Sequence, residues 1–180
     1  MFGSTEFGVW WGTLFSVLLL VGCVTDIRDR RIPNVLVLII LLTGVAYSVS
    51  TLSLVEGLIR SAAGAGLGFG IWIAFWLLGL LGAGDVKFFA AAGAWLGPGN
   101  AWRAALMAAI FGGGLAVYSL IRSRQLKSGV ERTALALSSR TLGVLDSTSE
   151  DAAGAKRHLP YGVALAAGAL AAAWLPKFLA

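Results

Sequence analysis

Two aspartates supply the chemistry that this sequence offers. Asp26 follows an uncharged apolar run, residues 9–24, and Asp85 stands at the start of a later apolar segment, directly after Gly82 and Gly84. These glycines remove side-chain bulk and let another backbone approach closely. Two carboxylates that face each other can share a proton, because ionising both at about 3 Å separation is unfavourable. One then activates a water as general base while the other polarises a carbonyl, which is the chemistry of peptide-bond hydrolysis.

Paired carboxylates within a membrane also serve the transport of protons or cations, so a small transporter is the alternative interpretation. A transport path needs polar residues on both sides of the membrane midplane. The run from Ala62 to Leu81 carries no charge and is rich in glycine. This argues against a path through that segment but leaves the alternative open.

The composition indicates that the chain lies in a membrane. Of 180 residues, 58% are hydrophobic, 24 are glycine and only 13% are charged, whereas soluble domains contain roughly 25% charged residues. The net charge of +5 would suggest nucleic acid if the basic residues formed one solvated face. They stand instead in short gaps between apolar runs, as in membrane-protein loops. We therefore expect the lipid bilayer, and no nucleic acid, as the environment of the chain.

The apolar runs predict an all-α fold, a polytopic membrane helical bundle with about six transmembrane segments. Crossing the hydrocarbon core takes about 20 apolar residues. The fourth run would span only about 18 Å as a helix, so either its neighbours extend it or it is a half-length element packed inside the protein. The predicted segments are Val9–Val24, Val35–Val49, Ala62–Leu81, Asp85–Leu96, Ala104–Leu120 and Tyr161–Leu175.

Basic residues predict the orientation. Three arginines stand between the first and second segments, and seven lysines and arginines occupy the polar region 121–159. Both regions fall on one side of a six-segment protein, which the positive-inside rule makes cytoplasmic. We expect a multi-pass inner-membrane protein, one domain over residues 1–180, with both aspartates at the cytoplasmic face. Region 121–159 is interpreted as a helix on the membrane surface or as an arm that contacts substrate.

The single Cys23 and single His158 limit the remaining chemistry. They exclude an internal disulfide and a cysteine-based zinc site, so we expect no metal and no cofactor. Cys23 is interpreted as an apolar filler, with a Cys23–His158 nucleophilic pair as the alternative. Tryptophans near segment ends are expected to anchor the membrane interface: Trp10, Trp11, Trp95, Trp102 and Trp174.

Three sequence blocks resemble the type IV prepilin peptidases, which are membrane aspartic proteases with a GxGD motif. The blocks are DIRDRRIPN at 26–34, GAGDVK at 82–87 and LPYGVA at 159–164. One block alone would be weak, but the three occur in order and extend over nearly the whole chain. The resemblance implies removal of the basic leader from prepilins and pseudopilins, by cleavage after a glycine at the cytoplasmic face.

The resemblance also implies roles for residues. Asp26 and Asp85 match the two catalytic aspartates, and Gly82 and Gly84 match the motif glycines. Lys87 also matches, and either biases the aspartate pair, meets an acidic substrate group or extends to the membrane surface.

Two further sets support the site by the same resemblance. Pro33 and Asn34 either aim Asp26 or simply begin the next helix. The third block contributes Pro160, Tyr161 and Gly162 as residues that line the site.

One departure from larger bacterial members bears on the activity. Those members carry an additional cytoplasmic segment with tetracysteine metal spacing and also N-methylate the mature pilin. This chain has one cysteine and a gap of about ten residues in that place, so we expect cleavage without methylation. The short form resembles the peptidases of tight-adherence (Flp-type) pilus systems and, more distantly, archaeal preflagellin peptidases. A structural subunit of a pilus assembly platform is a third interpretation.

Overall fold

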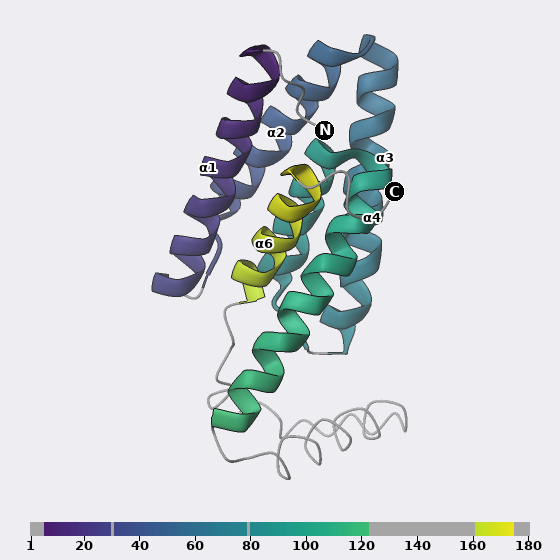
Figure 1. The fold of residues 1–180 in the computed structure, drawn as a ribbon. Coiled ribbons are helices and arrows are strands. Elements are labelled where there is room, and N and C mark those ends of the chain that lie inside the picture. Colours follow the sequence, from purple (N-terminus) through teal and green to yellow (C-terminus); the bar gives the residue numbers. More distant parts are fainter. Residues whose placement is uncertain (1–5, 30, 79, 123–160, 175–180) are drawn as a thin grey trace. The chain divides into compact units, whose positions relative to one another are not determined.

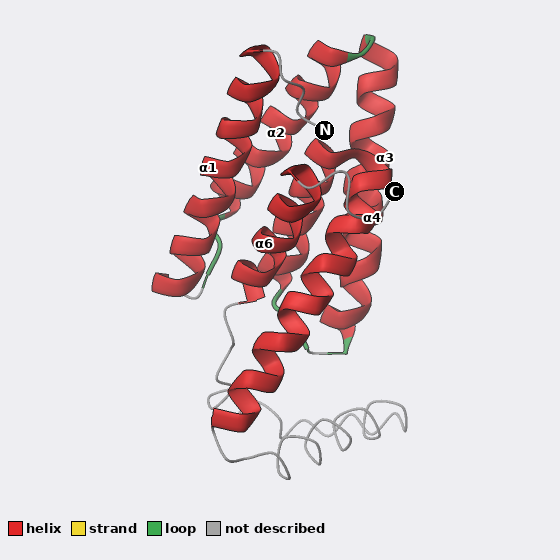
Figure 2. Ribbon diagram, viewed as in Figure 1, coloured by secondary structure: helices red, strands yellow, loops and turns green. Residues whose placement is uncertain are grey.

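Every regular element that the structure describes is a helix. The computed structural model describes residues 6–29, 31–78, 80–122 and 161–174, and no strand occurs among them (Figures 1 and 2). The predicted all-α fold is confirmed. The helices are α1 (Glu6–Asp29), α2 (Asn34–Thr51), α3 (Leu54–Leu77), α4 (Ala83–Arg122) and α6 (Tyr161–Trp174).

The chain divides into two compact units. The first comprises Met1–Gly112 and Pro160–Ala180, and the second comprises Gly113–Leu159. All contacts reported below lie within the first unit. Apart from the end of α4, region 121–159 falls outside the described residues, so its interpretation and the single-domain organisation stay predictions.

Three of the described helices are long and apolar enough to cross a membrane. They are Gly8–Asp29 with 22 residues, Asn34–Thr51 with 18 and Leu54–Leu77 with 24. The helix Tyr161–Trp174 is also apolar but shorter, with 14 residues. The lengths of the first three fit the roughly 20 residues that the hydrocarbon core requires, whereas the 14-residue helix is too short to cross it alone.

The first helix boundaries explain where Asp26 stands. Helix α1 continues to Asp29, past the predicted end at Val24, so Asp26 lies inside the helix and not in the loop after it. Pro33 is the N-cap of α2 with an extended backbone (φ −61°, ψ 134°), which agrees with the predicted restart at Asn34. The aspartate therefore has a fixed direction set by the helix.

The third helix begins earlier than expected. It starts at Leu54 and not at Ala62, because the Ser53 side chain caps it by accepting a hydrogen bond from the Glu56 N–H at 3.3 Å. The negative charge of Glu56, in the first turn of α3, also interacts favourably with the positive end of the helix dipole. The charges of Glu56 and Arg60 resemble loop markers in sequence but lie within α3.

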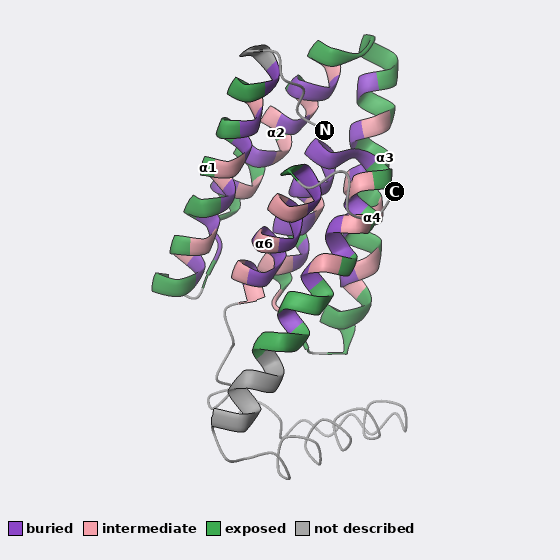
Figure 3. Ribbon diagram, in the orientation of Figure 1, coloured by how far each residue is buried: buried purple, intermediate pink, exposed green. Residues whose placement is uncertain are grey.

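Helix α4 consists of two helical halves that meet at a break. Gly97 has a left-handed backbone (φ 71°, ψ 170°) and Pro98 follows it. Residues 91–97 are all buried (Figure 3). The half of α4 before the break, residues 83–96, extends the predicted segment Asp85–Leu96 by two residues and is largely buried, which favours the interpretation of a half-length element packed inside the protein.

Polar side chains satisfy the carbonyls that the break leaves free. The Ser61 hydroxyl donates to the Ala94 oxygen at 2.9 Å, and Arg60 Nη2 donates to the Leu96 oxygen at 3.0 Å. Arg60 Nη1 also donates to the Ser48 hydroxyl on α2 at 2.9 Å. Because lipid supplies no hydrogen bonds, irregular backbone in a bundle of this kind requires such internal partners.

Glycines let α3 and the first half of α4 pack with their backbones in contact. A Cβ atom at Gly64 would overlap the Gly93 carbonyl, and a Cβ at Gly68 would lie 3.1 Å from the Phe89 oxygen. Moving one turn forward along α3 therefore corresponds to moving one turn back along α4, so the two helices are antiparallel. Small residues at such contacts are typical of helix packing in membranes.

One prediction about the tryptophans is wrong. Trp10, Trp102 and Trp174 are exposed, as interface anchors would be, but Trp95 is fully buried. Its indole N–H donates to the Ile40 oxygen at 2.8 Å, and its ring stacks on Tyr47 at 5.3 Å between centroids. Trp95 is thus a core residue that joins α4 to α2.

Candidate active site

Asp26 is held in place by the start of helix α6. Its side chain is 8% exposed, and its Oδ2 accepts a hydrogen bond from the Gly162 N–H at 2.9 Å. Gly162 is the second residue of α6, where backbone N–H groups have no partner within the helix. This hydrogen bond joins the block at 159–164 to the block at 26–34, between residues that are 136 positions apart in the sequence.

Only glycine fits at position 162 without displacing this carboxylate. A Cβ there would lie 2.6 Å from Asp26 Oδ2 and 3.0 Å from its Cγ. The Cys23 thiol, one turn before Asp26, donates to the Gly162 oxygen at 4.0 Å. Cys23 is half-buried in this contact, and His158 lies outside the described residues, so the proposed Cys23–His158 pair stays untested.

Asp85 is positioned by the turn that precedes α4. Its Oδ2 accepts a hydrogen bond from the Gly82 N–H at 3.3 Å, and its own N–H donates to the Gly82 oxygen at 3.1 Å. This reciprocal pair fixes the carboxylate in the first turn of the helix. The motif glycine thus contacts the aspartate that the motif contains.

The two aspartates lie at the same end of the bundle. A Cβ at Gly22 would lie 2.5 Å from Phe88 Cε2, so α1 and α4 pack tightly there. Asp26 follows Gly22 by one turn, and Asp85 precedes Phe88 by about one turn. A Cβ at Gly84 would lie 3.9 Å from Ile32 Cβ, so the loop before α2 lies against the first turn of α4.

Electrostatics link the two carboxyl groups. Asp85 lies in the first turn of α4, outside the three helices of spanning length. Burial and, secondly, the negative charge of Asp26 raise the pKa of Asp85 from 3.8 to about 6, while the hydrogen bond from Gly82 opposes this shift. A carboxyl group with such a pKa can hold a proton near neutral pH, as a general acid must.

Tyr161 completes the surroundings of the pair. It directly precedes Gly162, it is partly buried, and it interacts electrostatically with Asp85. The first two residues of α6 therefore interact with the pair, Gly162 by a hydrogen bond to Asp26 and Tyr161 by the charge of Asp85. Pro160, which precedes them, lies outside the described residues.

Three other expected residues are exposed. Lys87 is exposed, and Pro33 and Asn34 are exposed where α2 begins. Their position favours the interpretation that they begin α2. Gly22 and Phe88 were not predicted, although their spacing of one turn from each aspartate is a signal for a helix contact there.

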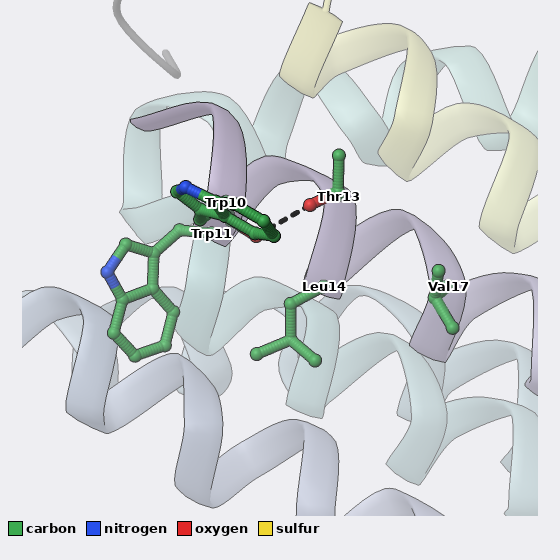
Figure 4. Close-up of a pocket in the computed structure, with 5 residues that line it drawn as sticks. All are labelled: Trp10, Trp11, Thr13, Leu14 and Val17. Carbon is green, nitrogen blue, oxygen red and sulfur yellow. Dashed lines mark hydrogen bonds between the residues drawn. The ribbon is translucent and has the colours of Figure 1, made fainter. Parts of the chain in front are cut away.

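No group of side chains suited to holding a metal ion occurs in the described part of the chain. A cavity of about 470 Å³ lies elsewhere on α1, lined by Trp10, Trp11, Thr13, Leu14 and Val17 (Figure 4). The Thr13 hydroxyl donates to the Trp10 oxygen at 2.8 Å. None of the five lining side chains is an acid or a base. Asp26 follows Val17, the last lining residue, by about 14 Å along the axis of α1.

One comparison with known proteins gives a match. The model of the type IV leader peptidase family matches residues 13–117, a range that includes Asp26, Gly82, Gly84 and Asp85. The match ends before α6. No curated protein and no solved structure is significantly similar to the chain.

Proposed function

The chain belongs to the type IV leader peptidase family, and from this premise we propose that it is an aspartic endopeptidase whose catalytic pair is Asp26 and Asp85. It hydrolyses the bond after the leader glycine of prepilins and pseudopilins at the cytoplasmic membrane face, without methylating the product. One observation carries the proposal: Asp26, bound by the Gly162 N–H, and Asp85, bound by the Gly82 N–H, lie at the same end of the bundle, each about one turn from the contact of Gly22 with Phe88. Burial and, secondly, the charge of Asp26 raise the pKa of Asp85 to about 6 there.

In the proposed reaction the pair holds one proton and titrates as a unit. The ionised carboxylate takes a proton from a water, whose oxygen bonds to the scissile carbonyl carbon. The protonated carboxyl, for which the raised pKa of Asp85 is suited, donates its proton to the carbonyl oxygen. The tetrahedral intermediate then collapses as the amide nitrogen takes a proton and the C–N bond breaks.

The bundle suits a substrate that stays in the bilayer. A prepilin has a basic leader followed by an apolar helix, and the bond between them must leave the helical conformation to be attacked. A glycine at this place eases unwinding by about 1 kcal/mol relative to alanine. Asp26 stands one turn before the end of α1, which fits a bond presented at the membrane boundary.

The test is leader removal by the purified full-length protein in proteoliposomes with a prepilin, followed by mass spectrometry. Asp26→Asn and Asp85→Asn should each lower kcat by at least about a thousandfold, because each leaves the pair without one of its two carboxyl groups. Asp29→Asn is the matched control, since Asp29 is exposed on the same helix and should retain cleavage. Robust cleavage by either pair variant would contradict the two-aspartate mechanism.

The same spectra test the two finer claims. The new amino terminus should follow the leader glycine, and its mass should show no added methyl group when a methyl donor is present. Methylated product would contradict the peptidase-only form.

A further inference from the structure

One buried hydrogen-bond donor near the site has no partner. Trp72 on α3 is 6% exposed, and its indole Nε1 is the one buried side-chain nitrogen or oxygen that lacks a hydrogen bond within the described part of the chain. Leaving such a donor unpaired costs free energy, so each instance asks for an explanation. Trp95, the other deeply buried indole of this bundle, donates to the Ile40 oxygen.

The packing places Trp72 against Phe89, one turn of α4 after Asp85. Its ring meets that of Phe89 edge to face, with centroids 5.6 Å apart, and Phe89 follows Asp85 by one turn of α4. The antiparallel contact of Gly68 with Phe89, continued by one turn, sets Trp72 opposite Asp85. The indole therefore lies at the depth of the site or up to one turn deeper in the bundle.

A substrate would place acceptors at this depth. Its apolar helix runs inward from the cleaved bond, and unwinding around that bond frees backbone carbonyls. Lipid offers these carbonyls no donor, so each needs one from protein. Of the two side chains in this ring contact, Phe89 has no hydrogen-bond donor and Trp72 has one, the buried indole N–H.

We propose that the Trp72 indole N–H donates a hydrogen bond to a backbone carbonyl of the substrate within about one turn of the cleaved bond, on its apolar side. This inference rests on the proposed leader peptidase function and names a substrate-contacting residue for it. Trp72 holds the unwound segment in the conformation that the aspartates attack.

The experiment replaces the N–H and little else. Incorporating benzothienylalanine at position 72 exchanges the N–H for sulfur in a ring of nearly the same shape, and Trp72→Phe is the simpler companion. With a prepilin in proteoliposomes, kcat/KM should fall by about tenfold in both variants. Melting temperature should not fall in the benzothienyl variant, because the N–H has no partner to lose in the free enzyme.

Two controls separate this effect from altered packing. Trp76→Phe changes an exposed indole one turn away and should keep wild-type kcat/KM. Trp95→Phe breaks an internal hydrogen bond and should lower the melting temperature.

The acceptor is located by a thermodynamic cycle. Prepilin peptides carry an ester in place of one amide at successive positions after the cleaved bond, since ester carbonyls are weaker acceptors. At the contacted position the ester should slow the wild type severalfold and the benzothienyl variant not at all. Additive effects at every position would overturn the inference.

Failure of the two proposals can be told apart. If the wild type cleaves and the benzothienyl variant cleaves equally well, the Trp72 contact is wrong while the peptidase assignment stands. If the wild type does not cleave a prepilin, both fall.

Discussion

At the scale of single residues, the two carboxyl groups of the site differ in how well the fold stabilises their charge. Asp26 accepts a hydrogen bond at 2.9 Å from the start of α6, whereas Asp85 has a longer bond of 3.3 Å from Gly82 and faces the charge of Asp26. Burying a charge beside a like charge destabilises the folded protein. Functional sites commonly carry such a cost.

We therefore predict that Asp85→Asn stabilises the protein in a pH-dependent way. The folded-state pKa of about 6 exceeds the unfolded value near 3.8, so folding loses stability as pH rises from about 4 to 6 and the full cost applies above. Removing the charge should raise the free energy of unfolding at pH 7.5 by up to about 3 kcal/mol. At pH 4 the two proteins should differ little.

Thermal unfolding in detergent, followed by tryptophan fluorescence, checks this sign. Asp29→Asn, which removes an exposed aspartate from α1, controls for the change in net charge. An equal shift in melting temperature at pH 4 and pH 7.5 would contradict the assignment of the cost to ionisation of Asp85.

At the scale of elements, the break in α4 depends on Arg60. Its guanidinium joins α3 to Ser48 on α2 and to the Leu96 oxygen on α4, and this fixes where the half-length helix ends. That helix begins with Asp85 at its other end. The contact thus stabilises the helix that carries Asp85 without touching the site itself.

Arg60→Met should lower the free energy of unfolding by about 2 kcal/mol, because it keeps the apolar stem but leaves the Leu96 carbonyl and the Ser48 hydroxyl without this donor. Arg28→Met removes an exposed arginine of α1 and should cost much less. Melting temperatures in detergent provide the measurement. A loss of kcat in correctly folded Arg60→Met would indicate instead that Arg60 acts on the chemistry.

The sequence predicts the elements better than their contacts. The restart at Pro33 and Asn34 follows from local backbone chemistry and is found, and the predicted end of the fourth segment at Leu96 agrees with the break at Gly97 and Pro98. The early start of α3 could not be predicted, because a charged Arg60 resembles a loop residue until its partners on two other helices are known. Local rules contain no information on such partners.

The site shows the same division. Both aspartates stand out by type, Asp85 also stands out by the neighbouring Gly82 and Gly84, and the three blocks indicate one family. The Gly162–Asp26 hydrogen bond and the position of Trp72 depend on how helices distant in sequence pack. The burial of Trp95 was missed for this reason, since its partner is a main-chain oxygen in the middle of α2.

At the scale of the molecule, exposed arginines stand at the end of the bundle that holds the two aspartates. The loop before α2 lies against the first turn of α4, and exposed Arg28 and Arg31 stand at this end. The loop at Leu52 and Ser53 lies at the opposite end of α2. Arginines flanking a spanning helix favour the cytoplasmic side, so this end, with both aspartates, should face the cytoplasm.

Cysteine labelling tests this orientation. In a Cys23→Ala background, which removes the single native thiol, Arg31→Cys and Ser53→Cys each place one thiol at an exposed position. A membrane-impermeant maleimide should label position 53 in spheroplasts and position 31 only in inverted vesicles, because α2 has the length to separate these positions by the hydrocarbon core. The reverse pattern would place the aspartates on the outer side, where the basic leader of a newly made prepilin is not presented.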